Sequence, residues 1–143
     1  MTTPHTPVPC TSHRRLVAAG LLAMLLGQAT GALAATPADL LADYTAQAGA
    51  PAQAARGQAF FTSTHGREWS CASCHGTVPA QAGKHASTGK PIGALAPAFN
   101  PERFTDPAKA EKWFRRNCND VVGRICTPAE KADVLAWLGT LKP

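Results

Sequence analysis

Methionine is nearly absent from this sequence. Its two methionines are Met1 and Met24, so no thioether sulfur is available anywhere between residues 25 and 143. A metal or cofactor bound by that part of the chain must therefore take its protein ligands from other side chains, such as histidine, cysteine, lysine or asparagine.

Long apolar runs are missing as well. The longest stretch, residues 16–26, is shorter than the roughly 20 residues that a membrane-spanning helix needs. Gly27, Gln28 and Thr30 then interrupt it. An uncleaved membrane anchor is the alternative that this short length disfavours.

The surroundings of the apolar stretch are typical of a secretory signal peptide. His13, Arg14 and Arg15 precede it, and the small-x-small sequence of residues 32–34 follows it. We expect residues 1–34 to be a signal peptide that is cleaved after Ala34, and residues 35–143 to be the exported, periplasmic domain.

Aromatic side chains are also few, with three tryptophans, one tyrosine and five phenylalanines in the whole chain. A domain of this size buries only about two-thirds of its unfolded surface. A bulky apolar cofactor at its centre would therefore add much to a small core.

The net charge is mildly basic. The formal charge of +5 falls to about +3 once Arg14 and Arg15 leave with the signal peptide. Export argues against nucleic acid as a partner. The remaining charge suits docking to an acidic redox partner, or serves only to keep the domain soluble.

No segment alternates apolar and polar residues as a strand does, and no internal repeat is present, so we predict an all-α protein. Helix-start patterns occur at residues 36–39, at 106–107 and at 127–130, the last being a capping box with proline at the first helical position. In chain order, the predicted elements are helices at about 37–48 and 52–63, a loop at 76–97, a short helical turn from Asn100, and helices at about 107–116 and from 128 onward.

Cysteine and histidine occur together in the motif CASCH, residues 71–75. Two cysteines three residues apart, followed directly by histidine, is the pattern that attaches haem c covalently. Cys71 and Cys74 would hold the porphyrin edge as thioethers, and His75 would bind the iron. A thioredoxin-like redox pair would need a preceding strand, and a zinc site would need two further ligands nearby. One covalent haem c is therefore the expected cofactor.

Two cysteines remain, Cys118 and Cys126, because Cys10 leaves with the signal peptide. An even remainder in an oxidising compartment predicts a disulfide between them. Two free thiols or half of a zinc site are the alternatives.

The motif does not identify the ligand on the other face of the iron. Without methionine, the candidates are His65, His85, a lysine such as Lys84 or Lys90, Asn117, or an open site. The chain just after the motif tends to wrap the side of the haem that carries its own histidine, and a protonated lysine is a poor ligand. On residue chemistry alone, Asn117 is a helix C-cap, because asparagine tolerates the left-handed conformation found there.

Two segments resemble the class I cytochromes c. Gly57 and Phe61 lie on the helix before the haem motif, and Trp137 lies on the last helix. In that family the first and last helices cross closely at a glycine and at aromatic residues. The resemblance implies a class I cytochrome c fold around one haem.

Residues 100–138 (NPERFTDPAKAEKWFRRNCNDVVGRICTPAEKADVLAWL) closely resemble the small exported haem proteins of the sphaeroides haem protein type, and the resemblance extends over residues 37–138. In that family an asparagine directly before a cysteine is the distal ligand of the oxidised iron. That cysteine forms a disulfide with one eight residues later. The matching residues here are Asn117, Cys118 and Cys126.

The resemblance also implies a function. An amide oxygen is a hard ligand that prefers ferric iron, so Asn117 should dissociate on reduction and leave a site for oxygen or nitric oxide. The expected partner is another cytochrome, either a dihaem cytochrome c or a membrane b-type cytochrome. The alternatives are a plain electron carrier with bis-histidine ligation through His65 or His85, and an enzyme that turns over nitric oxide or a peroxide.

Overall fold

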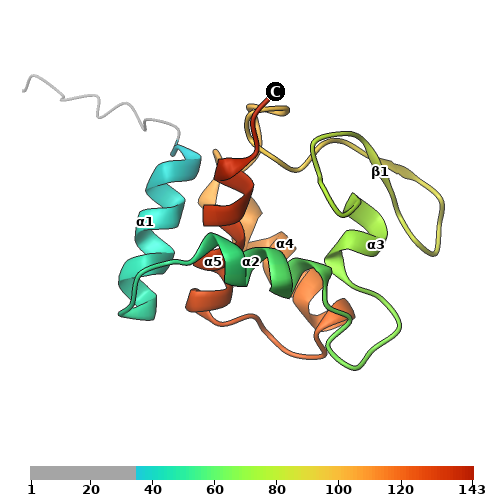
Figure 1. Cartoon of the computed structure of the whole chain (residues 1–143), viewed down its shortest axis with the longest axis horizontal. Coiled ribbons are helices and arrows are strands. Elements are labelled where there is room, and N and C mark those ends of the chain that lie inside the picture. The colour runs from blue at the N-terminus through green and yellow to red at the C-terminus, as the bar shows by residue number, and fades with distance from the viewer. Residues whose placement is uncertain (1–34) are drawn as a thin grey trace, which may run out of the picture. The chain divides into compact units, whose positions relative to one another are not determined.

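The computed structural model describes residues 35–143, so the predicted signal peptide and its cleavage site lie outside the described residues. Five helices carry most of the regular structure of this part: α1 (Pro37–Ala48), α2 (Ala54–Thr62), α3 (Cys71–His75), α4 (Pro107–Val121) and α5 (Pro128–Thr140) (Figure 1). The predicted all-α class is confirmed. None of the described helices is both long and apolar enough to cross a membrane.

Capping residues set the starts of α1, α4 and α5 where the sequence predicts them. The Thr36 hydroxyl accepts a hydrogen bond from the Asp39 N–H at 3.1 Å, and the Asp39 carboxylate accepts one from the Thr36 N–H at 2.8 Å. Thr127 and Glu130 form the same reciprocal box at α5. Asp106 caps α4 through its carboxylate alone. These bonds satisfy N–H groups that have no partner inside the helix.

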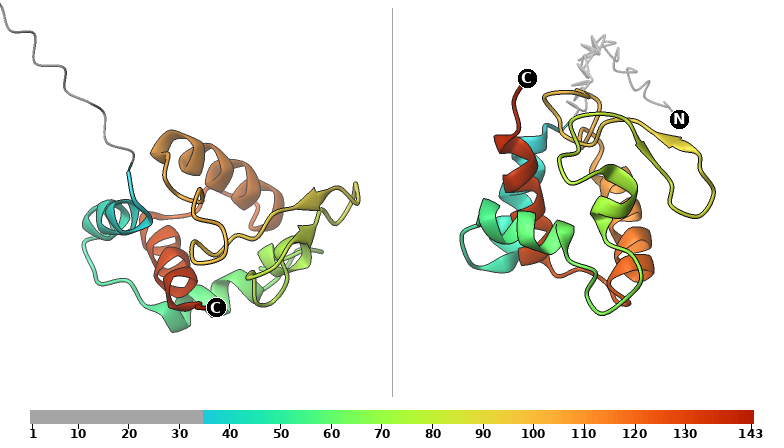
Figure 2. Two further views of the ribbon diagram at one scale, coloured as in Figure 1. Left: turned by 90° about the horizontal axis from the view of Figure 1, so that it is seen from above. Right: turned by 45° about the vertical axis from the view of Figure 1, so that its right-hand side comes forward.

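The helices α2 and α5 cross at close range (Figures 1 and 2). A Cβ atom on Gly57 would lie 1.9 Å from the carbonyl oxygen of Asp133 and 2.8 Å from the backbone nitrogen of Val134, so only glycine permits this approach. Beside the crossing, the rings of Phe61 and Trp137 pack with their centroids 5.0 Å apart. The crossing that the class I resemblance implies is therefore present.

A buried carboxylate also stabilises the crossing of α2 and α5. Asp133 of α5 accepts hydrogen bonds from the Gln53 N–H at 2.6 Å and from the Arg56 Nε at 2.7 Å. Burial alone would raise the pKa of Asp133, but the hydrogen bonds from Arg56 and Gln53 outweigh it and lower that pKa. The start of α2 is thus held to the middle of α5 by ionic and backbone hydrogen bonds.

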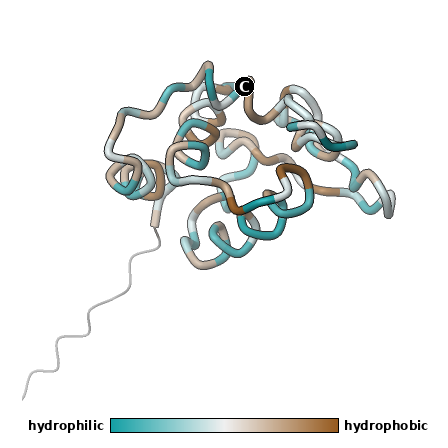
Figure 3. The backbone as a smooth tube through the Cα atoms, turned by 90° about the horizontal axis from the view of Figure 1, so that it is seen from below, coloured by the Kyte–Doolittle hydropathy of each residue, from teal (hydrophilic) through white to brown (hydrophobic). Residues whose placement is uncertain are grey.

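Two hydrophobic clusters lie on either side of α5. One joins α1 to α4 and α5, and the other joins α2 to α5, while Phe104 and Phe114 pack against both. By contrast, α4 carries mostly hydrophilic residues along its length (Figure 3). The buried members of the two clusters are Leu40, Tyr44, Ala110, Ala132 and Leu135 in the first, and Phe61, Ala96, Val134, Trp137 and Leu138 in the second.

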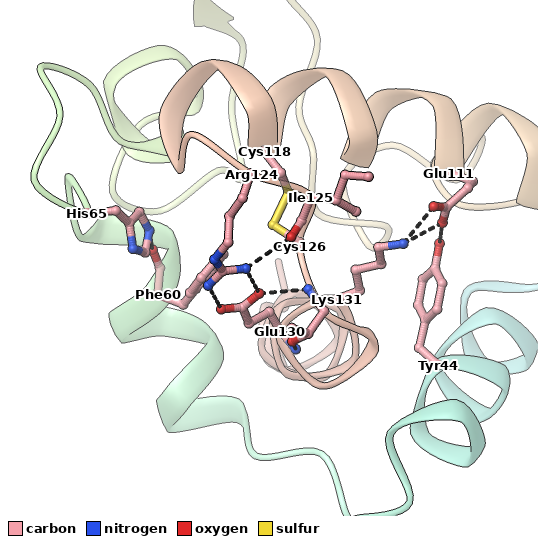
Figure 4. Close-up of a disulfide and its surroundings, with 11 residues drawn as sticks. Tyr44, Phe60, His65, Glu111, Cys118, Arg124, Ile125, Cys126, Glu130 and Lys131 are labelled. Carbon is pink, nitrogen blue, oxygen red and sulfur yellow. Dashed lines mark hydrogen bonds and ion pairs between the residues drawn. A yellow bond between two sulfur atoms is a disulfide. The ribbon is translucent and has the colours of Figure 1, made fainter.

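A polar cluster at the edge of this core connects three helices. The Lys131 Nζ of α5 donates to both carboxylate oxygens of Glu111 on α4, at 2.6 and 2.7 Å, and the Tyr44 hydroxyl of α1 donates to the same carboxylate at 2.9 Å (Figure 4). The Lys131 side chain is only 7% exposed, whereas that of Glu111 is 49% exposed. The ammonium group also lies 5.1 Å from the centre of the Tyr44 ring.

Three predictions about the chain need correction. The third long helix continues to Val121 rather than ending near residue 116, because Cys118 and Val121 are buried and extend its packed face. The short helical turn predicted from Asn100 is absent, because residues 101–104 form non-helical hydrogen-bonded turns. The loop at 76–97 contains two short strands, β1 (Gly83–Lys84) and β2 (Pro91–Ile92), which pair antiparallel. Strands of two residues are too short to produce a periodic pattern.

Candidate functional site

The CASCH motif forms α3, which is little more than one helical turn. The hydroxyl of Ser70 accepts from the Ser73 N–H at 3.2 Å, and that of Ser73 accepts from the Ser70 N–H at 3.0 Å. Residues three apart on a helix share one face, so the turn places Cys71 and Cys74 on the same side. Both cysteine side chains are partly buried.

His75 ends this turn as a neutral imidazole. Burial lowers the pKa of His75 to about 4, and the positive charge of Arg103 acts in the same direction. The Phe61 ring lies behind it, with the ring centroids 6.1 Å apart. A neutral imidazole is the form that binds a metal.

The surroundings of the two thiols fit haem attachment better than the alternatives. Burial raises the pKa of the Cys71 thiol to about 11, whereas a reactive redox thiol has a lowered pKa. No strand precedes α3 in the described chain. Among residues 35–143, no three His, Cys, Asp or Glu side chains gather as a zinc site requires. Two thiols and one neutral imidazole on a single turn are the set that a covalent haem c uses.

Asn117 lies inside α4 rather than at its end. The helix continues to Val121 and its C-cap is Val122, so the interpretation of Asn117 as a helix C-cap is wrong. Its neighbours in sequence face opposite ways, because Arg116 is exposed and Cys118 is buried. Asn117 itself is half-buried, at the border between the packed and the exposed faces of the helix.

A disulfide joins Cys118 to Cys126 in the structure, with an S–S distance of 1.98 Å and a Cα–Cα distance of 5.7 Å (Figure 4). This is the pairing that the cysteine count and the family resemblance predict. Arg124, inside the closed loop, forms an ion pair with Glu130 at 2.5 Å. The disulfide and the ion pair therefore connect the end of α4 to the start of α5 directly after Asn117.

Removing the disulfide should destabilise the domain measurably. Replacing both Cys118 and Cys126 with serine releases a loop of nine residues, for which the chain-entropy relation gives a loss of about 2–3 kcal/mol in the free energy of unfolding. Urea unfolding of the haem-containing protein measures this loss. The wild-type protein pretreated with a thiol reductant should unfold at the same urea concentration as the double variant. Equal midpoints for the oxidised wild type and the double variant would contradict the prediction.

The segment before the haem motif contacts the turn after α4. A Cβ atom on Gly123 would lie 3.0 Å from the Nη1 of Arg67, and Gly123 has a φ of +80°. A pocket between these segments is lined by Gly66, Arg67, Glu68, Trp69 and Asp120. The segment that leads into the haem motif is therefore in contact with the turn that follows α4.

His65 and His85 both have hydrogen-bond partners within the protein. The Nε2 of His65 is 2.9 Å from the Phe60 carbonyl oxygen, and its ring packs against the Phe60 ring (Figure 4). The Nδ1 of His85 lies 3.3 Å from the Thr88 N–H, in the turn between β1 and β2. These contacts occupy one ring nitrogen of each histidine, Nε2 of His65 and Nδ1 of His85.

The β1–β2 pair lies on the α3 side of the domain (Figure 1). A Cβ atom on Gly83 would lie 2.1 Å from the Cys74 carbonyl oxygen, which shows how closely β1 approaches α3. Two lysines of the β1–β2 pair are exposed. Lys84 lies in β1, and Lys90 lies directly before β2. The strand that carries Lys84 therefore lies against the turn that ends at His75.

Arg103 is a residue near the site that the sequence analysis missed. Its guanidinium donates to the carbonyl oxygens of Ala94 and Gly93, each at 2.9 Å, and the Asn100 amide donates to the same Ala94 oxygen at 3.1 Å. These bonds fix the irregular chain at residues 93–103, and the charge of Arg103 acts on His75. An arginine in a turn gives no sequence signal for this role.

Comparison with known proteins places this site in a family. Residues 47–138 match the family described as a domain of unknown function, DUF1924. The cytochrome c-type protein SHP of Cereibacter sphaeroides is 56% identical over 107 residues, covering 72% of this chain and 82% of the relative.

Solved structures agree. The structure of oxidised SHP, described as an oxygen-binding cytochrome c, has a TM-score of 0.70 and 53% identity, covering 75% of this chain and 98% of that one. The solution structure of cytochrome c'' from Methylophilus methylotrophus, described as giving insight into haem-ligand detachment, has a TM-score of 0.63 and 38% identity over 75% of this chain and 94% of that one.

These matches define a c-type cytochrome with a single covalently attached haem. Within that class, the chain belongs to the DUF1924 family and is a member of the family of the cytochrome c-type protein SHP.

Proposed function

We propose that this cytochrome binds diatomic ligands such as oxygen or nitric oxide at the iron, at a position that Asn117 occupies in the oxidised protein. In this proposal Cys71 and Cys74 would attach the haem and His75 would bind its iron in both oxidation states. The observation that carries the proposal is the geometry of α3, a single helical turn that contains Cys71, Cys74 and His75.

The distal assignment to Asn117 is supported by position and by the lack of competitors. Asn117 is half-buried on a rigid helix and directly precedes the disulfide-bonded Cys118. The protein has no methionine beyond Met24, and each candidate histidine has one ring nitrogen within hydrogen-bond distance of another protein group. A neutral amide oxygen is a weak, hard ligand, so the side chain would be held by ferric iron and released on reduction.

Ligand binding is supported by the relatives. The SHP structure is described as that of an oxygen-binding cytochrome c, and the cytochrome c'' structure concerns detachment of a haem ligand. The haem supplies an iron that changes oxidation state and accepts a small ligand when ferrous. The protein's part is to hold His75 neutral and in place, and to offer or withdraw the amide of Asn117.

The cellular setting forms part of the same proposal. We infer that residues 1–34 direct export and are removed, so that the domain works in the periplasm. Its redox partner would be another cytochrome, either a dihaem cytochrome c or a membrane b-type cytochrome. Turnover of nitric oxide or a peroxide is the second candidate function, and steady-state consumption of these substrates in the presence of a reductant would reveal it.

Absorption spectra test the role of Asn117. Asn117→Ala should change the ferric spectrum from six- to five-coordinate and leave covalent haem content unchanged, because attachment depends on α3 alone. The matched control is Asn119→Ala, which removes an exposed amide two residues further along the same helix. The wild-type ferrous protein should bind carbon monoxide rapidly.

Two results would contradict the proposal. A ferric spectrum that Asn117→Ala leaves unchanged would remove Asn117 from the iron. A ferrous wild-type protein that is six-coordinate and inert to carbon monoxide would favour the plain electron carrier, with both axial positions permanently filled.

A further inference from the structure

The exposed face of α4 carries a concentration of positive charge that the site does not use. Four basic residues fall within the eight positions 109–116, and all four are exposed. None of them has a carboxylate within ion-pair distance among residues 35–143, where the ion pairs involve Arg56, Arg124 and Lys131. The four residues are Lys109, Lys112, Arg115 and Arg116.

An exposed tryptophan lies among these charges. Trp113 is 42% exposed, and the guanidinium carbon of Arg116 lies 5.6 Å from the centre of its ring. Tryptophan and arginine are the residues most enriched at protein–protein interfaces and at their energetic centres. An exposed aromatic ring already stacked against an arginine is a preformed contact element of this kind.

The pattern has a defined extent. Lys109, Lys112, Trp113 and Arg116 are spaced at three, four and seven residues, which places them on one face of the helix. Acidic residues limit that face at both ends, with Asp106 as the N-cap and Asp120 near the C-terminal end. A patch bounded in this way specifies the register of a partner surface as well as its charge.

We propose that this face of α4, formed by Lys109, Lys112, Trp113 and Arg116, is the docking surface for an acidic face of the electron-donor protein. Naming the partner as the electron donor rests on the proposed function. Arg116 directly precedes Asn117, so a partner bound here lies against the helix that carries the proposed distal ligand. An anionic membrane is less suitable, because the acidic ends of the patch would repel a uniformly negative surface.

The test measures reduction of the oxidised, haem-containing protein by two donors. The first is reduced flavodoxin, an acidic protein, and the second is lumiflavin semiquinone, a small neutral molecule. Replacing Lys109, Lys112 and Arg116 together with glutamine should slow reduction by flavodoxin roughly tenfold at about 10 mM ionic strength. The difference should disappear at about 0.5 M salt, where charges are screened, and the lumiflavin rate should not change.

A matched control keeps the same change in net charge. Lys84, Lys90 and Lys142 are also exposed and lie outside α4, so their combined replacement with glutamine should leave most of the flavodoxin rate intact. Trp113→Ala provides a second variant. It removes an apolar ring and no charge, so salt should not alter its effect on the reduction rate. It should slow reduction by flavodoxin at both ionic strengths.

Several outcomes would overturn the docking surface. If the control variant slows the flavodoxin reaction as much as the α4 variant does, the donor contacts the β1–β2 pair instead, or only the net charge of the protein matters. An α4 variant that keeps the wild-type flavodoxin rate but no longer binds phosphatidylglycerol vesicles would make the patch a membrane contact. Binding of carbon monoxide to the ferrous protein tests the proposed function separately, because the α4 substitutions leave Asn117 in place.

Discussion

Gly57→Ala should destabilise the domain by more than about 4 kcal/mol, a size reached only by a few kinds of substitution. The added methyl group would lie 1.9 Å from the Asp133 carbonyl oxygen and 2.3 Å from its carbonyl carbon. Both are backbone atoms of a buried helix, so no side chain can move aside. The helices α2 and α5 must separate, and separation also strains the bonds from Asp133 to Gln53 and Arg56.

The control for this substitution is in the same fold. Gly139 is exposed near the end of α5 and a Cβ atom there meets nothing within 4 Å, so Gly139→Ala should raise stability by about 0.5 kcal/mol through reduced freedom of the unfolded chain. Urea unfolding and the yield of haem-containing protein report both variants. A Gly57→Ala variant with a wild-type midpoint would show that the crossing tolerates a wider spacing.

Glu111→Ala should cost about 3 kcal/mol of unfolding free energy, because it leaves the Lys131 ammonium buried without its counter-charge. It also removes the acceptor of the Tyr44 hydroxyl. Adding Lys131→Met to the variant should restore most of the loss, since a methionine fills similar space without a charge. Glu102→Ala, at an exposed turn residue, is the control and should change little. Failure of the second substitution to restore stability would assign the loss to Tyr44 instead.

The same pair gives stability a pH dependence. Burial would raise the pKa of Glu111, but hydrogen bonds from Lys131 and Tyr44 outweigh it and lower that pKa below the ordinary 4.5. A lowered pKa in the folded state contributes stability above the unfolded value, and that stability is lost as pH falls through the folded value. Wild-type stability should therefore fall below about pH 4.5, and the Glu111→Ala, Lys131→Met variant should lose less over that range.

The helical framework could be predicted because its signals are local. Thr36 and Thr127 lie in capping sequences that the structure reproduces, and Gly57 marks the crossing. The end of α4 could not be predicted in this way. Its last residues include asparagine and aspartate, which favour helices weakly, and burial of Cys118 and Val121 outweighs that preference.

The candidate site also combines features that local sequence predicts with features that depend on distant contacts. Cys71, Cys74 and His75 form a contiguous motif, so their placement on one turn follows from sequence alone. Arg103 acts on His75 from a distant turn, and its place depends on the carbonyl groups of residues 93 and 94. The engagement of His65 with Phe60 likewise depends on a left-handed backbone at His65, with a φ of +53°, which no sequence pattern indicates.

The position of Asn117 inside α4 also sets the kind of movement open to it. Its backbone belongs to a helix that continues for four residues beyond it and whose end the disulfide anchors. In the proposed function, the Asn117 amide would therefore leave or return by rotation about its own side-chain bonds, with no refolding of a loop. Rotations of exposed side chains take picoseconds to nanoseconds. Nitric oxide expelled from the ferric iron by a light flash should therefore compete with a returning amide, whereas a ligand expelled from the ferrous iron should rebind without that competition.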